Sequence, residues 1–199
     1  MAVAVEHDKR RKKILDKALA VFVEDGFEDA TFQKIADRSG ITRTILYLYF
    51  KNKREIFTYS IKQLLLNIED DIIAIRNEKS LSCTEKLTNI LLILFKHAEK
   101  NRQLLSVVLD YLLHIAKSDI NPEERVRRRT VRLRRILSSI LLEGVRTGEF
   151  KKVKVRPAYD YLYSFIETAI FQLVVLKRKN LDEHREAAVF AVKQLQALK

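Results

Sequence analysis

Apolar residues recur three or four positions apart along nearly the whole chain of 199 residues, the spacing that puts them on one face of a helix. The first such face comprises five residues: Ile14, Leu15, Ala18, Leu19 and Phe22. The chain contains only four Gly and two Pro, so few positions interrupt these patterns. We therefore expect an all-α protein with about nine helices.

Turn and capping residues divide the first third of the chain into three short helices and the start of a long one. Gly26 is expected to end the first helix, at about residues 9–23, in a left-handed conformation. Gly40 lies in a tight turn between the second and third helices. Three residues fit the N-cap position of the helices that follow them: Thr31, Thr42 and Asn52.

Five further helices are expected beyond the long helix, which should end near Arg76. Ser82 and Glu85 have the spacing of a capping box and start the next one. The others are expected at residues 102–116, from Asn121-Pro122 to about 147, from Pro157 to about 179, and from Asp182 onward. The pattern predicts two domains, a helix-turn-helix domain at 1–56 and an all-helical domain at 57–199.

Residues 31–54 have the pattern of a helix-turn-helix, in which the second helix enters the major groove of DNA. Such a helix exposes its first residues to base edges, and here these are Thr42, Arg43 and Thr44. DNA binding is therefore the leading hypothesis. The net charge of +12 adds little, because residues 1–60 hold 12 Lys and Arg against 9 Asp and Glu.

The segment 10–64 resembles the N-terminal domain of the TetR family of bacterial repressors. Matching residues at matching spacing carry the resemblance: Phe22 with Gly26-Phe27, Thr31 with Ile35-Ala36, Ser39-Gly40-Ile41-Thr42, Leu46-Tyr47 with Tyr49-Phe50, and Lys51-Asn52-Lys53 with Ile56. Thr44, Ile45 and Leu48 differ from the Gly, Thr and polar residue that are frequent in the family. The resemblance implies a DNA-reading head followed by a variable half that binds a ligand and dimerises.

Seven residues are predicted to contact DNA: Thr31, Thr42, Arg43, Thr44, Tyr47, Tyr49 and Lys53. Arg43 has two donors for guanine, a pairing worth about 1–3 kcal/mol of discrimination. The two tyrosines fit phosphate oxygens, as do Thr31 and Lys53 at helix N-termini. Other roles remain open. Tyr47 fits a role in packing, the threonines fit roles as caps only, and Arg43 fits a contact with phosphate in place of a base. The basic run at 9–13 fits either phosphate contacts or a solvated first turn.

In the second half, a cavity for a small-molecule effector is implied by the resemblance. Polar residues within apolar helices are the candidates to orient that effector: His97, Tyr111, His114, Glu167, Thr168 and Gln172. Each of them alone fits a structural role as well, and a buried Glu167 would need a partner. The two histidines do not have a metal-ligand spacing, so we expect neither metal nor cofactor.

The run 125–135 is unusually rich in arginine, with Arg125, Arg128, Arg132 and Arg135 on one face and Arg127, Arg129 and Arg134 beside them. Like charges one helical turn apart repel each other. A solvated face explains the run, and so does an anionic effector such as a phosphate-bearing acyl thioester.

The last two helices are expected to pair with their copies in a homodimer, as the resemblance implies. The residues expected to face the partner are Leu162, Phe165, Ile166, Ala169, Leu173, Leu176, Ala188, Ala191, Leu195 and Leu198. A two-fold dimer places its reading heads about 34–36 Å apart and implies a palindromic double-stranded operator.

The sequence therefore predicts a ligand-responsive, DNA-binding repressor. A constitutive or architectural DNA-binding dimer is the alternative, and a helical enzyme or a membrane-surface binder is a more distant one. No nucleophile–base set or glycine-rich phosphate loop is present in the sequence, so no catalytic residue is predicted. The absence of a secretory signal, the single Cys and the short longest apolar run, 166–176, favour a cytoplasmic protein without a membrane span.

Overall fold

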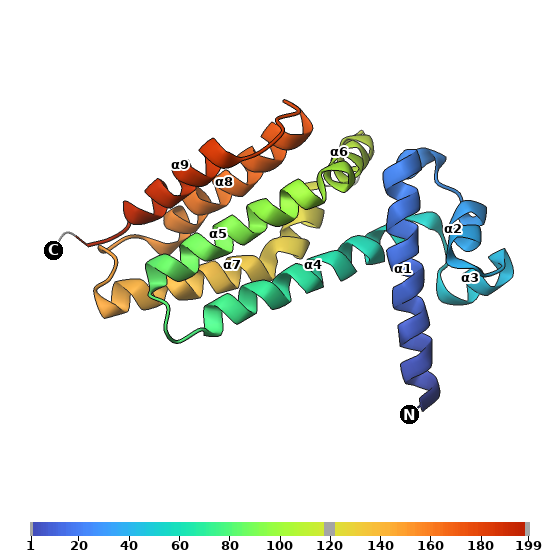
Figure 1. Cartoon of the computed structure of the whole chain (residues 1–199), viewed down its shortest axis with the longest axis horizontal. Helices are drawn as coiled ribbons and strands as arrows, with labels where there is room; N and C mark the ends of the chain where they lie inside the picture. The colour runs from blue at the N-terminus through green and yellow to red at the C-terminus, as the bar shows by residue number, and fades with distance from the viewer. Residues whose placement is uncertain (1, 118–121, 198–199) are drawn as a thin grey trace. The chain divides into compact units, whose positions relative to one another are not determined.

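The computed structural model describes residues 2–117 and 122–197, without the side chains of residues 2–5, 122, 125, 128 and 129. Within this described part the chain forms nine helices (Figure 1). They are α1 (Ala2–Asp29), α2 (Phe32–Ser39), α3 (Arg43–Tyr49), α4 (Lys53–Asn77), α5 (Cys83–Lys100), α6 (Arg102–Ala116), α7 (Pro122–Thr147), α8 (Val155–Val174) and α9 (Asp182–Lys193). The predicted all-α fold is confirmed.

The helices form two compact units, each with its own core. Unit 1 comprises the described residues of Met1–Asn67 and Ser106–Ile120, and unit 2 those of Ile68–Leu105 and Asn121–Lys199. Helix α4 contributes its first part to unit 1 and its last part to unit 2. A change in the course of α4 therefore affects residues of both units, because one continuous helix contributes to each.

Unit 1 has a core rich in aromatic rings. Phe22, Phe50 and Phe57 are fully buried, and α6 adds Val107, Tyr111 and Ile115 to the same cluster. Gly26 has a φ of 78° and a ψ of 175°, so it kinks α1 at the position where the sequence predicted a left-handed end of the helix. The kink directs Phe27 toward Phe57 and Tyr111, with ring centroids 5.0 and 4.6 Å away. Helix α1 nevertheless begins earlier and ends later than the sequence pattern indicated.

Unit 2 is a bundle in which α5 contacts α7, α8 and α9. Fully buried residues of α5 include Leu87, Ile90 and Phe95. Figure 1 shows the four helices side by side, with α7 and α8 joined by a short connection. The expectation for α8 and α9 needs a correction, because Leu162, Ala169, Leu173, Ala188, Ala191 and Leu195 are buried in the core of the unit itself. They cannot also line a surface for a second copy.

Residues far apart in the sequence join the ends of unit 2. The Glu149 carboxylate accepts the backbone N–H groups of Cys83, at 2.8 Å, and Thr84, at 2.6 Å, at the start of α5. The Leu195 carbonyl accepts the N–H of Lys151 at 3.0 Å. Arg185 pairs with Glu99, linking α9 to α5. The hydrogen bonds of Glu149 satisfy N–H groups that a helix start leaves without partners.

Two helix boundaries differ from the predicted ones for local reasons. Helix α8 begins at Val155, so Pro157 lies in its first turn, where a missing N–H costs nothing. It ends at Val174, and Lys177 then adopts a φ of 52°. The predicted start at Asn121 lies outside the described residues. Among the described helices, none has the length and apolar character that crossing a bilayer requires.

Candidate functional site

Local hydrogen bonds build the segment from α2 to α3. Thr31 Oγ1 accepts the N–H of Lys34 at 3.2 Å, and Thr42 Oγ1 accepts the N–H of Ile45 at 3.3 Å. Gly40 closes α2 with a φ of 66°. Both predicted threonine caps and the predicted glycine turn are confirmed, so the start of α3 is fixed by residues that surround it in the sequence.

Helix α3 is buried on one face and open on the other. Leu46 is fully buried, whereas Thr42, Arg43, Thr44, Tyr47 and Leu48 are exposed. Arg43 Nη2 donates to the Tyr47 hydroxyl at 3.1 Å. The Tyr47 ring also stacks on Phe32 of α2, with centroids 4.6 Å apart. The exposed side chains at the start of α3 thus include a guanidinium group and a phenol held next to each other.

Three other predicted contact residues lie in unit 1 near the ends of its helices. Thr31 is exposed at the start of α2. Tyr49 is half-buried and stacks on His7 of α1 at 4.6 Å. Lys53 Nζ donates to the Glu28 carbonyl at 2.6 Å and lies 4.7 Å from the Phe27 ring centroid. The contacts of Lys53 give it a structural role that the sequence pattern did not reveal.

The basic run at 9–13 is part of α1. The Arg11 guanidinium lies 4.9 Å from the Phe50 ring centroid and 4.2 Å from that of Tyr59, so this arginine packs on the unit. Lys9, Arg10, Lys12 and Lys13 are exposed. They leave a basic surface on the N-terminal half of α1.

The six predicted effector residues are distributed over both units. Tyr111 and His114 belong to α6 in unit 1. Tyr111 is buried against Phe27 and Phe57, and its hydroxyl has no hydrogen-bond partner among the described residues. His114 Nε2 lies 3.8 Å from Glu28 Oε1. Both residues thus have contacts within unit 1 itself.

The remaining four lie in unit 2. His97 Nε2 is 2.8 Å from Asp71 Oδ2, which joins α5 to the end of α4. Glu167 and Thr168 are exposed on α8, and Gln172 is half-buried. Because Glu167 is exposed, it does not need the buried partner that the sequence suggested for it. Their role in effector binding stays a prediction.

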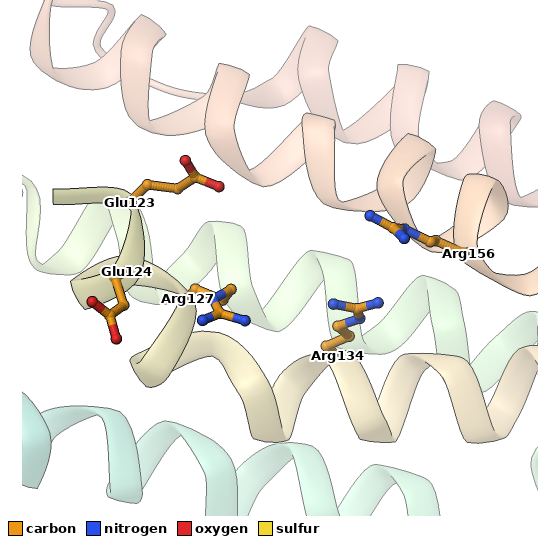
Figure 2. A pocket seen from close by; sticks show the side chains of 5 residues that line it. All are labelled: Glu123, Glu124, Arg127, Arg134 and Arg156. Atoms are coloured by element: carbon orange, nitrogen blue, oxygen red, sulfur yellow. The ribbon is translucent and has the colours of Figure 1, made fainter. Parts of the chain in front are cut away.

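A hollow of about 610 Å³ lies between α7 and the start of α8 (Figure 2). Five described residues line it: Glu123, Glu124, Arg127, Arg134 and Arg156. Two of these arginines come from α7 and one from α8. None of the six predicted effector residues is among the described residues that line it.

Tyr159 lies next to this hollow and supports one of its arginines. The Arg134 guanidinium lies 5.6 Å from the Tyr159 ring centroid. Burial raises the pKa of Tyr159 to about 12, so the phenol stays neutral at physiological pH. Arginine groups that face a common opening are suited to phosphate or carboxylate oxygens. The sequence indicated the α7 arginines but not Arg156, whose only signal was the basic stretch 151–156.

Two polar contacts attach the end of α4 to the rest of unit 2. Arg132 Nη1 on α7 is 2.9 Å from Glu69 Oε2, and the second contact is the pair of His97 and Asp71 described above. Arg132 belongs to the same helix as Arg127 and Arg134. Helix α7 thus provides both the arginine-lined hollow and a direct bond to α4.

The described residues contain no group of three or more His, Cys, Asp or Glu side chains arranged to hold a metal ion. Exposed hydrogen-bonding and charged side chains lie on the open face of α3 and around the hollow between α7 and α8.

Comparison with protein families gives a match at residues 14–59 to the model for bacterial regulatory proteins of the tetR family. These residues include α2, α3 and their threonine caps. The chain is a TetR-family transcriptional regulator. Members of this family bind DNA through the helix-turn-helix and regulate transcription, and these properties apply to this TetR-family protein.

Relatives of this TetR-family regulator match beyond the helix-turn-helix. The fatty acid metabolism regulator protein of Bacillus subtilis is 28% identical over 172 residues, which cover 84% of each chain. The crystal structure of FadR from Bacillus subtilis, solved in complex with stearoyl-CoA, superposes with a TM-score of 0.72 at 26% identity, over 92% of this chain and 98% of that one. A TetR transcription regulator from Haloarcula marismortui has a TM-score of 0.83 at 21% identity, over 96% of this chain and 100% of that one, and it supports the fold.

Proposed function

We propose that this TetR-family regulator is a dimeric repressor that leaves a palindromic operator when a long-chain acyl-CoA binds unit 2. The observation that carries the proposal is the hollow lined by three arginines, Arg127, Arg134 and Arg156, which outnumber its two glutamates, Glu123 and Glu124. The similarity to a fatty acid metabolism regulator and to FadR with stearoyl-CoA supports this class of effector.

The chemistry of an acyl-CoA fits unit 2 at both of its ends. Its phosphates carry negative charges that arginines bind with paired hydrogen bonds, which are stronger than neutral ones. Its acyl chain needs an apolar environment, and the proposal requires the apolar bundle of α5, α7 and α8 to open and admit it. Free stearate lacks the phosphates and free CoA lacks the chain, so each should bind more weakly than the thioester.

Helix α4 is the proposed route from the effector to the reading head. An effector that attracts the α7 arginines changes the surroundings of Arg132, which holds Glu69 of α4. The effector weakens DNA binding only as far as it prefers a conformation that fits the operator poorly. Breaking the contact between α4 and α7 should therefore weaken the coupling more than the binding of the effector.

Dimerisation through α8 and α9 remains part of the proposal, with different residues from those expected. The apolar side chains that α8 and α9 expose include Tyr161, Phe171, Val175 and Phe190. Tyr161 and Phe171 lie on α8 and Val175 directly follows it, and at about 100° per residue the three positions fall within about 80° of one another around the helix axis. Exposed apolar patches of this kind are typical of protein interfaces.

The test starts with an operator selected from a random DNA pool and then titrates the complex with stearoyl-CoA. We expect enrichment of a palindrome and its release by stearoyl-CoA, with little release by CoA or stearate. Arg134→Ala should weaken stearoyl-CoA binding about 10-fold or more. Arg146→Ala, at an exposed position on the same helix away from the hollow, is the matched control.

The coupling is tested separately with Glu69→Gln, and Asp70→Asn serves as the control. Glu69→Gln should keep its affinity for stearoyl-CoA and lose part of the release from DNA. If the protein binds its operator normally and no acyl-CoA of any chain length releases it, the constitutive DNA-binding dimer is favoured instead. If Arg134→Ala and Arg146→Ala changed the affinity for stearoyl-CoA equally, the hollow would not be the binding site.

A further inference from the structure

One exposed side chain on α3 has no explanation in the packing of unit 1. Leu48 is 76% exposed, the highest value among the large apolar side chains of the described residues. Leu46, two positions earlier, is fully buried. The same short helix therefore holds one leucine in the core and leaves the other in solvent, on the side where the predicted DNA contacts lie.

The open face of α3 has a polar edge and an apolar edge. Arg43 and Tyr47 are four residues apart and joined by a hydrogen bond, so they form the polar edge. Thr44 and Leu48 are also four residues apart, so they are neighbours on the helix surface, about one turn from each other. The methyl group of Thr44 and the side chain of Leu48 thus provide an apolar strip beside the guanidinium of Arg43.

We propose that this strip reads the 5-methyl group of a thymine, with Leu48 as the specificity-determining residue. The proposal rests on α3 entering the major groove, as the proposed function requires. The thymine methyl is the apolar group that a base edge presents there. Leucine has neither donor nor acceptor for a phosphate, so a sequence-dependent role for Leu48 must use apolar contact.

The polar edge of α3 determines where in the half-site that thymine should lie. Arg43 is suited to the O6 and N7 atoms of guanine, and its contact with Tyr47 fixes its position on the helix. A helix that carries both edges should prefer a half-site in which a guanine and a thymine are close together. The preference for the thymine should depend on its methyl group and not on its hydrogen-bonding atoms.

The experiment replaces each thymine of the selected operator, one position at a time in both half-sites, with deoxyuridine. Deoxyuridine keeps every hydrogen-bonding group of thymine and lacks only the methyl. For the wild-type protein we expect one position per half-site at which the replacement lowers affinity about 4-fold per half-site, the factor that corresponds to one buried methyl group. At the other thymines the change should be close to neutral.

Leu48→Ala should distinguish the thymine and deoxyuridine operators much less than the wild type does, because it removes the larger part of the apolar strip and leaves only the Thr44 methyl. Leu113→Ala removes another exposed leucine, on α6 of the same unit, and should keep the full penalty. Melting temperatures of the two variants check that unit 1 stays folded. Since Leu48 is exposed, its replacement should change stability by less than that of a core residue.

The outcomes separate this inference from the proposed function. If no oligonucleotide is enriched, the operator proposal fails and the inference fails with it. If an operator is found and deoxyuridine is neutral at every position, or the half-site has no thymine, only the inference fails. A Leu48→Ala protein that is weaker on all operators but keeps the deoxyuridine penalty would show a contact with the backbone and would also overturn it.

Discussion

The α2–α3 segment and unit 2 are organised by contacts of very different range. Thr31 caps the N–H of Lys34 and Thr42 that of Ile45, each three residues away. In unit 2, by contrast, Glu149 caps the start of α5 from 65 residues away. The start of α3 can therefore be predicted from neighbouring residues, whereas the contact between Glu149 and α5 depends on how distant parts of the chain pack. The family model matches residues 14–59, which include the locally capped segment.

The largest effect should come from the core of the α2–α3 segment. Leu46→Ala removes a fully buried side chain and should lower the free energy of unfolding of unit 1 by about 2–5 kcal/mol. Urea unfolding followed by circular dichroism measures it. Leu48→Ala, on the open face of the same helix, is the control. Similar losses for both variants would contradict the assignment of the two faces of α3.

The corresponding disturbance in unit 2 is Gly144→Ala. A Cβ at this position would overlap the buried ring of Phe150, so the change should cost about 1–3 kcal/mol in stability. Differential scanning calorimetry should show a lower melting temperature. The double variant Gly144→Ala with Phe150→Leu should recover part of the loss. A single substitution without effect would mean that the ring moves freely, and that unit 2 is less tightly packed here than described.

A smaller effect is expected at the cap of α3. Thr42→Ala removes the acceptor for the N–H of Ile45 and should cost about 1 kcal/mol. Thr42→Ser retains the hydroxyl and should retain most of the stability. If Thr42→Ala matched the wild type in thermal unfolding, the start of α3 would not depend on its local cap, and the contrast between the two regions would weaken.

The smallest effect concerns pH and the distant cap of α5. Burial opposes ionisation of Glu149, but hydrogen bonds from Thr84 and Cys83 outweigh it and leave the pKa of Glu149 lowered. A lowered pKa in the folded state stabilises the fold above the ordinary value of about 4.5, and this contribution disappears as pH falls through the folded pKa. Glu149→Gln should therefore melt earlier than wild type at pH 7, and the difference should shrink toward pH 3. A difference that stays constant with pH would exclude the carboxylate as its cause.

The sequence predicted the fold class and the local geometry of the α2–α3 segment well. A threonine before a helix or a glycine in a turn has one dominant physical role, so these residues could be assigned without knowledge of their neighbours. The pairing of Arg43 with Tyr47 was also within reach, because residues four apart meet on a helix.

The effector residues were harder to predict for a geometric reason. A polar residue in an apolar helix lies in a cavity, in the core or in solvent depending on which helices surround it. Tyr111 is in the core of unit 1 and Glu167 is in solvent, although both interrupt similar apolar runs. The meeting of Arg156 with the α7 arginines likewise depends on how α8 packs against α7, which no local pattern contains.

The position of Cys83 makes unit 2 able to report on its own opening. It is the single cysteine of the chain, and burial together with the charges of Glu149 and Glu143 raises its pKa to about 11. At neutral pH the sulfur is therefore both shielded and protonated, and alkylating reagents react with the thiolate. The rate of alkylation then reports how often the first turn of α5 separates from Glu149. Any compound that binds the closed bundle will lower this rate, and the measurement needs no attached dye.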